Sequence, residues 1–320
     1  MTVRSFTDLV QCEHPLQLAA MGGAASTVLA VAVADAGGLG MIAGADRWPL
    51  GLGDTLRHLA TQAAGPVGVN FLVPFLQMTD VELAAARAPV VEFFWGPPDT
   101  HLIETVHGGG ALAGWQIGSV ADARAAEAAG CDYVILQGME AGGHVAGRRT
   151  LQKLLEDGRA VIDIPIVAAG GLGSAATVAA AFAAGADAVR VGTRLLAAHE
   201  TPAHPDYVDA IIEASAADTV LTTVFGTGWP DARHRVLRSA VEAVETHDDD
   251  PVGEIHIDGR AVPVPRAAPV WPDSRFIGHT GATALYAGHS VDGVTTRQSA
   301  AEIIAELLED TPQRPDAEMN

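Results

Sequence analysis

Residues 165–194 read PIVAAGGLGSAATVAAAFAAGADAVRVGTR, and this stretch contains one complete unit of a parallel α/β fold. Its two ends, Pro165–Ala169 and Ala188–Val191, are the nearly continuous apolar runs expected of parallel strands that are buried on both faces. Ala175–Ala184 lies between them with a helical pattern, with Ser174 as a candidate N-cap and a glycine just past its end. The stretch therefore predicts a strand, a helix and a second parallel strand.

The same alternation extends back to the N-terminus. The other predicted strands are Pro15–Ala19, Leu39–Ala43, Val67–Phe71, Val90–Phe94, Ala111–Ile117 and Tyr133–Leu136. The other predicted helices are Thr27–Ala36, Asp54–Ala64, Asp80–Ala88, Thr100–His107, Val120–Ala129 and Thr150–Asp157. Eight strands that alternate with helices over roughly 180 residues favour a closed (β/α)₈ TIM barrel. A doubly wound open sheet stays a competing fold, because periodicity alone does not determine closure.

The sequence changes character after the eighth predicted strand. Residues 199–280 are rich in histidine and proline and contain an acidic run, which predicts an inserted lid of helices and loops. Helices are expected at Tyr207–Ala214 and Arg233–Val244 within it, and Ser299–Leu308 has the spacing of the last barrel helix. The predicted domains are thus a barrel over 1–198 and 281–310, the lid over 199–280, and a frayed tail over 311–320.

Composition and charge exclude several classes of protein. The chain has 19 Lys and Arg residues against 39 acidic ones, so its net charge of −20 argues against a nucleic-acid partner. No signal peptide or membrane-spanning run is visible, and Cys12 and Cys131 are too few for a disulfide framework. The scattered histidines lack metal-ligand spacing. We therefore expect a cytoplasmic protein without a metal site, with a homodimer left open.

Polar and glycine residues gather where the predicted strands end, which is the face on which TIM barrels carry their active sites. Gly170-Gly171 and Gly192-Thr193 follow the last two strands of the barrel. Loops at these two positions hold phosphate in many such barrels, because glycines let backbone amides approach an anion at a helix N-terminus. The alternative for Gly170-Gly171 is a tight turn between strand and helix.

Three polar side chains near strand ends are candidate functional groups. His144 lies in a Gly-Gly-His segment after the sixth strand, and histidine is the side chain best suited to proton transfer near neutral pH. Asn70 and Gln137 have two interpretations. They are either satisfied core polar groups or amides that bind the carbonyl and nitrogen atoms of a heterocycle.

Together these motifs resemble the nitronate monooxygenase family, formerly called 2-nitropropane dioxygenases, whose superfamily includes FMN-dependent enoyl-acyl-carrier-protein reductases. The resemblance covers most of the chain, through Met21–Thr27, Ala36–Gly40, Gly68–Phe71, Gln137–His144, Val167–Leu172, Val191–Arg194 and Tyr286–Gly288. It implies a TIM barrel that binds one non-covalent FMN, with His144 as the active-site histidine. It also implies that Met21, Gly22, Asn70, Gln116, Gln137 and Gly142 meet the flavin, and that Gly170, Gly171, Arg190, Val191, Gly192 and Thr193 hold its phosphate side.

The resemblance implies an FMN-dependent oxidoreductase that oxidises alkyl nitronates with O₂ to carbonyl products and nitrite. In this interpretation a protonated His144 favours an anionic substrate. An NAD(P)H-dependent reductase of an enoyl or acyl thioester or a quinone is the nearest alternative. Arg233, His234, Arg235 and Arg238 form a basic cluster that could serve its partner, but one solvated helix face is the favoured interpretation of this cluster. A non-catalytic flavin-binding barrel is a third possibility.

Overall fold

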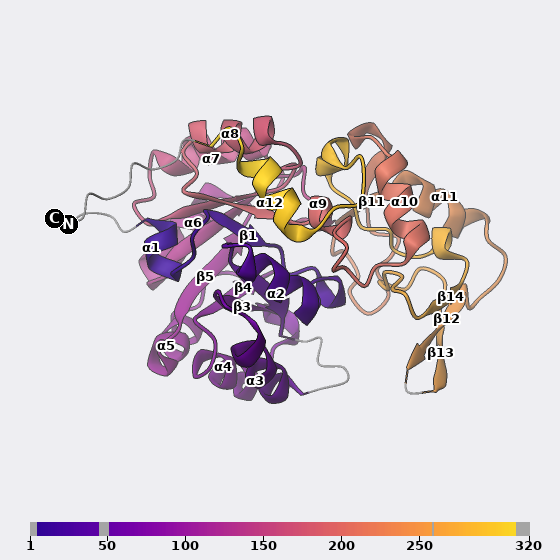
Figure 1. The fold of residues 1–320 in the computed structure, drawn as a ribbon, viewed down its shortest axis with the longest axis horizontal. Helices are drawn as coiled ribbons and strands as arrows, with labels where there is room; N and C mark the ends of the chain where they lie inside the picture. Colours follow the sequence, from indigo (N-terminus) through magenta and orange to yellow (C-terminus); the bar gives the residue numbers. More distant parts are fainter. Residues whose placement is uncertain (1–4, 45–50, 258, 312–320) are drawn as a thin grey trace.

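The computed structural model describes residues 5–44, 51–257 and 259–311. Eight parallel strands form a barrel surrounded by helices (Figure 1). In their order around the barrel they are β1 (Leu16–Leu18), β9 (Ala188–Val191), β8 (Ile166–Ala169), β6 (Tyr133–Gln137), β5 (Leu112–Ile117), β4 (Val90–Phe94), β3 (Val67–Leu72) and β2 (Gly40–Ala43).

Backbone hydrogen bonds close the barrel between its first and second strands. The Leu18 amide donates to the Leu39 carbonyl at 2.9 Å, and Gln17 bridges Leu39 in parallel, while the other edge of β1 pairs with β9. All eight predicted strands are present with nearly the predicted ends. The predicted TIM barrel is confirmed, and the doubly wound open sheet was the wrong alternative.

Several of the eight barrel helices begin or end at capping residues. The eight are α2 (Thr27–Asp35), α3 (Leu52–Gln62), α4 (Met78–Ala85), α5 (Thr100–Gly109), α6 (Val120–Ala129), α7 (Leu151–Arg159), α8 (Ala175–Ala183) and α12 (Ala300–Leu308). Serine side chains accept backbone N–H groups at the starts of α6, α8 and α12. Gly110 and Gly130 end α5 and α6 in the left-handed conformation that glycine adopts without strain.

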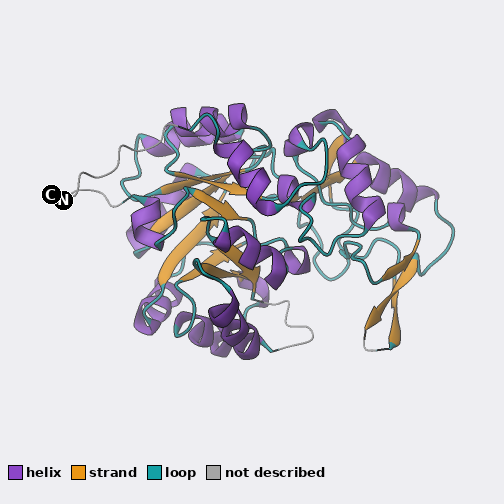
Figure 2. Cartoon of the chain, in the orientation of Figure 1, coloured by secondary structure: helices purple, strands orange, loops and turns teal. Residues whose placement is uncertain are grey.

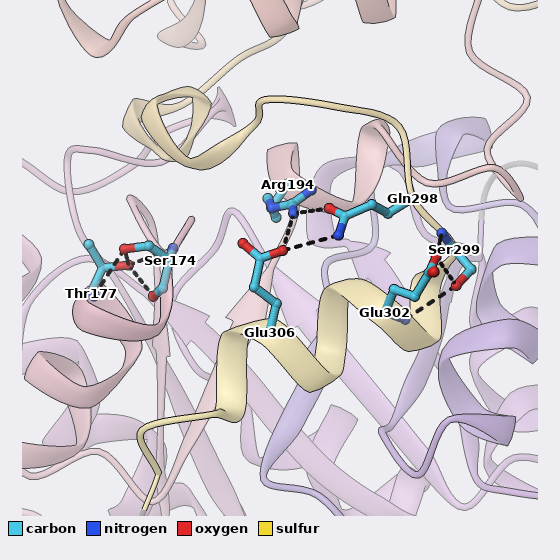
Figure 3. A network of polar contacts seen from close by, with 7 residues as sticks. All are labelled: Ser174, Thr177, Arg194, Gln298, Ser299, Glu302 and Glu306. Carbon is cyan, nitrogen blue, oxygen red and sulfur yellow. Dashed lines mark hydrogen bonds and ion pairs between the residues drawn. The ribbon is translucent and has the colours of Figure 1, made fainter.

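The last barrel helix, α12, packs against α2 and α8, so the prediction for Ser299–Leu308 is confirmed. A buried arginine ties α12 to the short helix α9 (Thr193–Leu196) that follows the eighth barrel strand (Figure 3). Arg194 donates through Nη2 to Glu306 Oε2 at 3.0 Å and to Gln298 Oε1. Figure 3 also shows Ser174 and Thr177, which form the capping box that starts α8. The Arg194 contacts fix the segment that follows β9, and the capping box fixes the start of the helix that follows β8.

The lid contains strands as well as helices (Figure 2). Its helices are α10 (Pro205–Glu213) and α11 (Arg238–Thr246), and its strands are β10 (Thr219–Thr222), β11 (His234–Leu237), β12 (Gly253–Ile257), β13 (Arg260–Val264) and β14 (Phe276–Gly278). The expectation of helices and loops was therefore incomplete. The predicted helix at Arg233–Val244 was wrong over its first residues, because 234–237 form a fully buried strand between two partners, and pairing overrides local propensity.

One lid sheet includes a piece of the barrel. The two-residue strand β7 (Gly143–His144), in the loop after β6, pairs antiparallel with β11, which also pairs with β10. The other lid sheet has the order β13-β12-β14. Residues 282–294, which the sequence predicts to rejoin the barrel, contribute Leu285, Val291 and Val294 to the hydrophobic cluster of the lid. The short helices η4 (Thr280–Ala282) and η5 (His289–Gly293) belong to this return segment.

The expected frayed tail lies outside the described residues, except for Thr311. Among the helices of the described ranges, none has the length and apolarity needed to cross a membrane.

Candidate active site

A cavity of about 380 Å³ lies at the carboxyl ends of the barrel strands and is roofed by the lid. It is lined by barrel residues such as Asn70 and Arg190 and by lid-side residues such as Tyr207, Trp271 and Tyr286. Twelve of the thirteen residues predicted for the site line it: Met21, Gly22, Asn70, Gln116, Gln137, Gly142, His144, Gly170, Gly171, Arg190, Gly192 and Thr193. Val191 does not, because its side chain is buried in the core of the barrel.

The glycine loops adopt backbone that other residues tolerate poorly. Gly170 and Gly171 have φ values of +109° and +74°, which place both in the left-handed region. A Cβ on Gly142 would lie 2.5 Å from the Gly288 nitrogen, so the two backbones approach more closely than a side chain permits. Thr193 Oγ1 accepts a hydrogen bond from this same Gly288 N–H at 3.0 Å. The loops that follow β6, β8 and β9 therefore converge with the return segment from the lid around one end of the cavity.

A buried polar network forms the floor of the cavity. Its centre is Glu92, which is fully buried in β4 and accepts hydrogen bonds from Gln17 Nε2 (2.6 Å) and Tyr133 Oη (2.6 Å), in addition to its ion pair with Arg190. Asn70 Nδ2 also donates to Glu92, at 3.4 Å. Burial and the adjacent Glu92 carboxylate raise the pKa of Tyr133 well above its ordinary value, so this hydroxyl keeps its proton and donates it.

Arg190 extends from β9 into the barrel rather than toward the glycine loops. Its Nε donates to Gln17 Oε1 at 3.0 Å, its Nη1 to Gln116 Oε1 at 2.5 Å, and its Nη2 to Glu92. The resemblance implies a place for Arg190 on the phosphate side, whereas the structure places its guanidinium among polar groups from β1, β4 and β5. The reason is strand geometry: successive side chains alternate faces, and that of Arg190 points into the barrel.

His144 stands in an aromatic cage at the wall of the cavity. Its ring stacks on Trp229 with centroids 4.3 Å apart and meets the edge of Trp95 at 5.7 Å. Tyr286 and His234 lie 5.9 and 5.4 Å away. Trp95 is in the left-handed region with φ +66°, a conformation that is uncommon for a large side chain and that marks functional sites.

Burial in this cage, and secondarily the neighbouring His234, lower the pKa of His144 from 6.5 to about 4. His144 is therefore neutral at pH 7, so the expectation of a protonated His144 that attracts an anion was wrong. Burial also lowers the pKa of His234, although the hydrogen bond from its Nδ1 to the Ala232 carbonyl (2.9 Å) acts in the opposite direction. Its Nε2 accepts from the Phe225 amide (3.3 Å), which requires an unprotonated nitrogen. Both ring nitrogens of His234 are thus occupied, whereas those of His144 have no hydrogen-bond partner among the described residues.

Two arginines of the basic cluster predicted at 233–238 are used in contacts within the protein. The Arg233 guanidinium donates to the carbonyls of Ala146 and Gly147 at 3.2 and 3.1 Å. Buried Arg235 donates to the Met139 carbonyl at 2.8 Å and to a threonine hydroxyl. These arginines join the lid strand β11 to the loop after β6.

Several residues of the site were not predicted from the sequence. Glu92 had one available signal, which is a lone charge inside the apolar run of β4. Trp95 and Trp229 gave none, since their importance depends on a tertiary contact with His144. Tyr286 was noted only as part of a motif, and its buried hydroxyl has no hydrogen-bond partner among the described residues. In those same residues, no group of three or more His, Cys, Asp or Glu side chains is arranged to hold a metal ion.

Comparison with known proteins identifies the family. The profile described as nitronate monooxygenase matches residues 4–87 and 75–310. The chain belongs to the nitronate monooxygenase family. Members of this family are oxidoreductases, and this chain is one of them, as the resemblance implied.

The proteins similar to this oxidoreductase have names that describe different enzymes. A Mycobacterium tuberculosis protein, (3aS,4S,5R,7aS)-5-hydroxy-7a-methyl-1-oxo-octahydro-1H-indene-4-carboxyl-CoA dehydrogenase, is 35% identical over 75% of this chain and 68% of its own length. FabK from Thermotoga maritima has a TM-score of 0.76 at 29% identity, with 96% of each chain covered. Nitroalkane oxidase from Streptomyces ansochromogenes has a TM-score of 0.72 at 28% identity, covering 96% of this chain and 98% of its own. The chain spans 68%, 65% and 67% of three curated relatives that it matches.

Proposed function

We propose that this chain is an FMN-dependent nitronate monooxygenase that oxidises small alkyl nitronates with O₂ to carbonyl compounds and nitrite. The observation that carries the proposal is the position of His144 at the wall of a small cavity with a polar floor, with ring nitrogens that have no hydrogen-bond partner among the described residues. Family membership and the 28% identity with nitroalkane oxidase support the same activity.

The hydrogen-bonding groups on the cavity floor fit a flavin. Glu92 only accepts hydrogen bonds, so the Asn70 amide turns its NH₂ toward Glu92 and leaves its carbonyl oxygen free. Arg190 only donates, so Gln116 turns its carbonyl toward Arg190 and leaves its NH₂ free. The floor thereby offers an acceptor and several donors to a heterocycle that has both ring N–H and carbonyl groups. Gly170, Gly171 and Gly192 would hold the phosphate end.

When bound, FMN would supply the electron acceptor and the oxygen chemistry of the reaction. His144, neutral at pH 7, can accept the α-proton of a nitroalkane and can orient a nitronate that is already ionised. Trp95 and Trp229 pack against the ring of His144 and limit its orientation. A cavity of about 380 Å³ is near the low end of the range for drug-sized ligands, so a substrate that shares it with a flavin would have to be small.

The second candidate is an NAD(P)H-dependent reductase or dehydrogenase of an acyl thioester. The specific observation in its favour is the 35% identity with a dehydrogenase that acts on a CoA thioester. Against it, Arg233 and Arg235 are committed to protein carbonyls and do not offer free charges to a nucleotide. A third candidate, a non-catalytic flavin-binding barrel, does not account for the aromatic cage around His144.

One experiment separates these functions. Purified protein is loaded with FMN, made anaerobic, and mixed separately with propionate-3-nitronate, NADH and NADPH, while the flavin absorbance is followed. We expect the nitronate to change the flavin spectrum and, once O₂ is admitted, nitrite to accumulate. Bleaching by NADH or NADPH with no response to the nitronate would favour the reductase, and no response to any donor would favour the non-catalytic barrel. Heat release of the pigment must yield FMN rather than FAD.

Substitution of the histidine tests its role. His144→Asn should retain FMN and lose about 10²–10⁴-fold in kcat/KM with a neutral nitroalkane, the usual contribution of a general base. The nitronate needs no proton removal, so the loss should be smaller with that substrate. Equal and full activity of the FMN-loaded variant on both forms would show that His144 is structural.

A further inference from the structure

Arg190 is the only charged side chain among the described residues that line the cavity, since His144 is neutral at pH 7. Its counter-charge, Glu92, is fully buried and does not line the cavity. The cavity therefore has a cation at its surface and the compensating anion one layer behind. Charges in such a water-poor site act more strongly than they do in water.

The position of Arg190 is fixed from several sides. Three of its N–H groups are used by Gln17, Gln116 and Glu92, which come from three different barrel strands. A guanidinium has five N–H donors, so two remain. In the strand register Gln17 lies beside Arg190, and Asn70 lies beside Glu92, so the pair is built into the barrel itself. Arg190 is thus held rigidly at the floor with donors still available.

We propose that the charge of Arg190 raises the electron affinity of the flavin. Glu92 holds Arg190 in place and partly offsets the charge of Arg190. This inference rests on the proposed function, because it assumes that a flavin occupies the cavity. Uptake of two electrons and one proton leaves a flavin ring with one additional negative charge. A fixed cation at the cavity surface favours that state, and charge near the ring is a recognised means by which proteins adjust flavin chemistry.

The proposal predicts opposite effects for the two members of the ion pair. Arg190→Gln removes the cation and leaves the carboxylate, so the flavin should be harder to reduce. Glu92→Gln keeps the cation and removes its offset, so the flavin should be easier to reduce. A purely structural pair predicts instead that both variants change in the same direction, because each breaks the same contact.

Sulfite provides the measurement, since it adds to the oxidised flavin to form an anionic adduct whose stability follows the same charge. FMN-loaded wild-type and variant proteins are titrated with sulfite, and FMN dissociation constants and dye-equilibrated reduction potentials are measured in parallel. We expect Arg190→Gln to weaken sulfite binding about tenfold or more and Glu92→Gln to strengthen it. Tenfold corresponds to about 30 mV for a two-electron couple.

Two further variants complete the test. Arg190→Lys keeps the charge and should retain most of the sulfite affinity. Tyr133→Phe removes a hydrogen bond to Glu92 without changing a charge, and should leave sulfite affinity near that of the wild type. If a single variant does not hold FMN, the double variant Arg190→Gln with Glu92→Gln contains no unpaired charge and should still bind sulfite less tightly than the wild type.

Shifts of the same sign in both single variants, or an unchanged double variant, would overturn the inference. None of these measurements uses a nitronate or measures turnover, so they can fail while the proposed activity stands. If the wild-type protein binds no FMN at all, the proposed function falls first, and this inference falls with it.

Discussion

The ionisation state of His144 can be tested by its effect on stability. Burial lowers the pKa of His144 to about 4 in the folded protein, whereas an unfolded chain has a value near 6.5. Below pH 6.5 the unfolded chain takes up a proton that the folded protein does not. The stabilisation from neutral His144 is therefore complete above pH 6.5 and is lost as the pH falls from 6.5 through 4.

The size of this effect follows from the shift. One pKa unit corresponds to about 1.4 kcal/mol, so a shift of this size is worth about 3 kcal/mol, of which about 2 kcal/mol is lost by pH 4.5. His144→Asn has no titrating ring and should not show this part of the loss. All other groups titrate in both proteins, so the difference between them isolates His144.

The assay is urea unfolding of wild-type protein and His144→Asn at pH 7 and pH 4.5. We expect the free energy of unfolding of the wild type to fall by about 2 kcal/mol more than that of the variant. An NMR titration of the His144 ring provides an independent pKa. Equal losses in the two proteins, together with a ring that titrates near 6.5, would refute the conclusion that His144 is buried and neutral.

Three other substitutions test separate parts of the site. Trp229→Ala uncovers the His144 ring, so the pKa of His144 should rise toward 6.5 by NMR titration, whereas Trp229→Phe keeps an aromatic cover and should change it less. Gly171→Asp should abolish FMN retention in a folded protein. The uncharged control Gly171→Asn tolerates the same positive φ and should retain more FMN. Equal flavin content in the two variants would contradict a phosphate at this loop. Glu306→Ala removes a charged partner of buried Arg194 and should lower the free energy of unfolding by about 2 kcal/mol. Glu306→Gln should lower the free energy of unfolding less. A melting curve identical to that of the wild type would show that the contact contributes nothing to stability.

The barrel was predictable because its signals are local. Each strand is a short apolar run, and several helices are bounded by caps, as with Ser119 and Gly130 around α6. Such patterns depend on a few neighbouring residues, so they can be recognised without knowledge of the tertiary contacts. Closure of the barrel was favoured by the count of strands and then established by the contact of β1 with Leu39.

The lid strands and the roles of individual side chains were less predictable, because they depend on contacts between distant segments. β11 reads locally as the start of a helix, and only its partners β7 and β10 make it a strand. Similarly, the sequence identified His144 but not its charge, since the pKa is set by Trp229 and His234 from the lid. The polar floor was predicted only in part, since Asn70 and Gln116 were expected at the site and Glu92 was not.

The pairing of β7 with β11 has a consequence for how new specificities could arise in this chain. His144 is encoded in the barrel half of the sequence, yet its backbone is a strand of a lid sheet. A chimera in which residues 199–280 come from another protein would replace β11 but keep β7. The two strands would then no longer match, and their pairing is what orients His144. The unit that determines specificity is therefore discontinuous in sequence. The loop after β6 and the lid must be exchanged together.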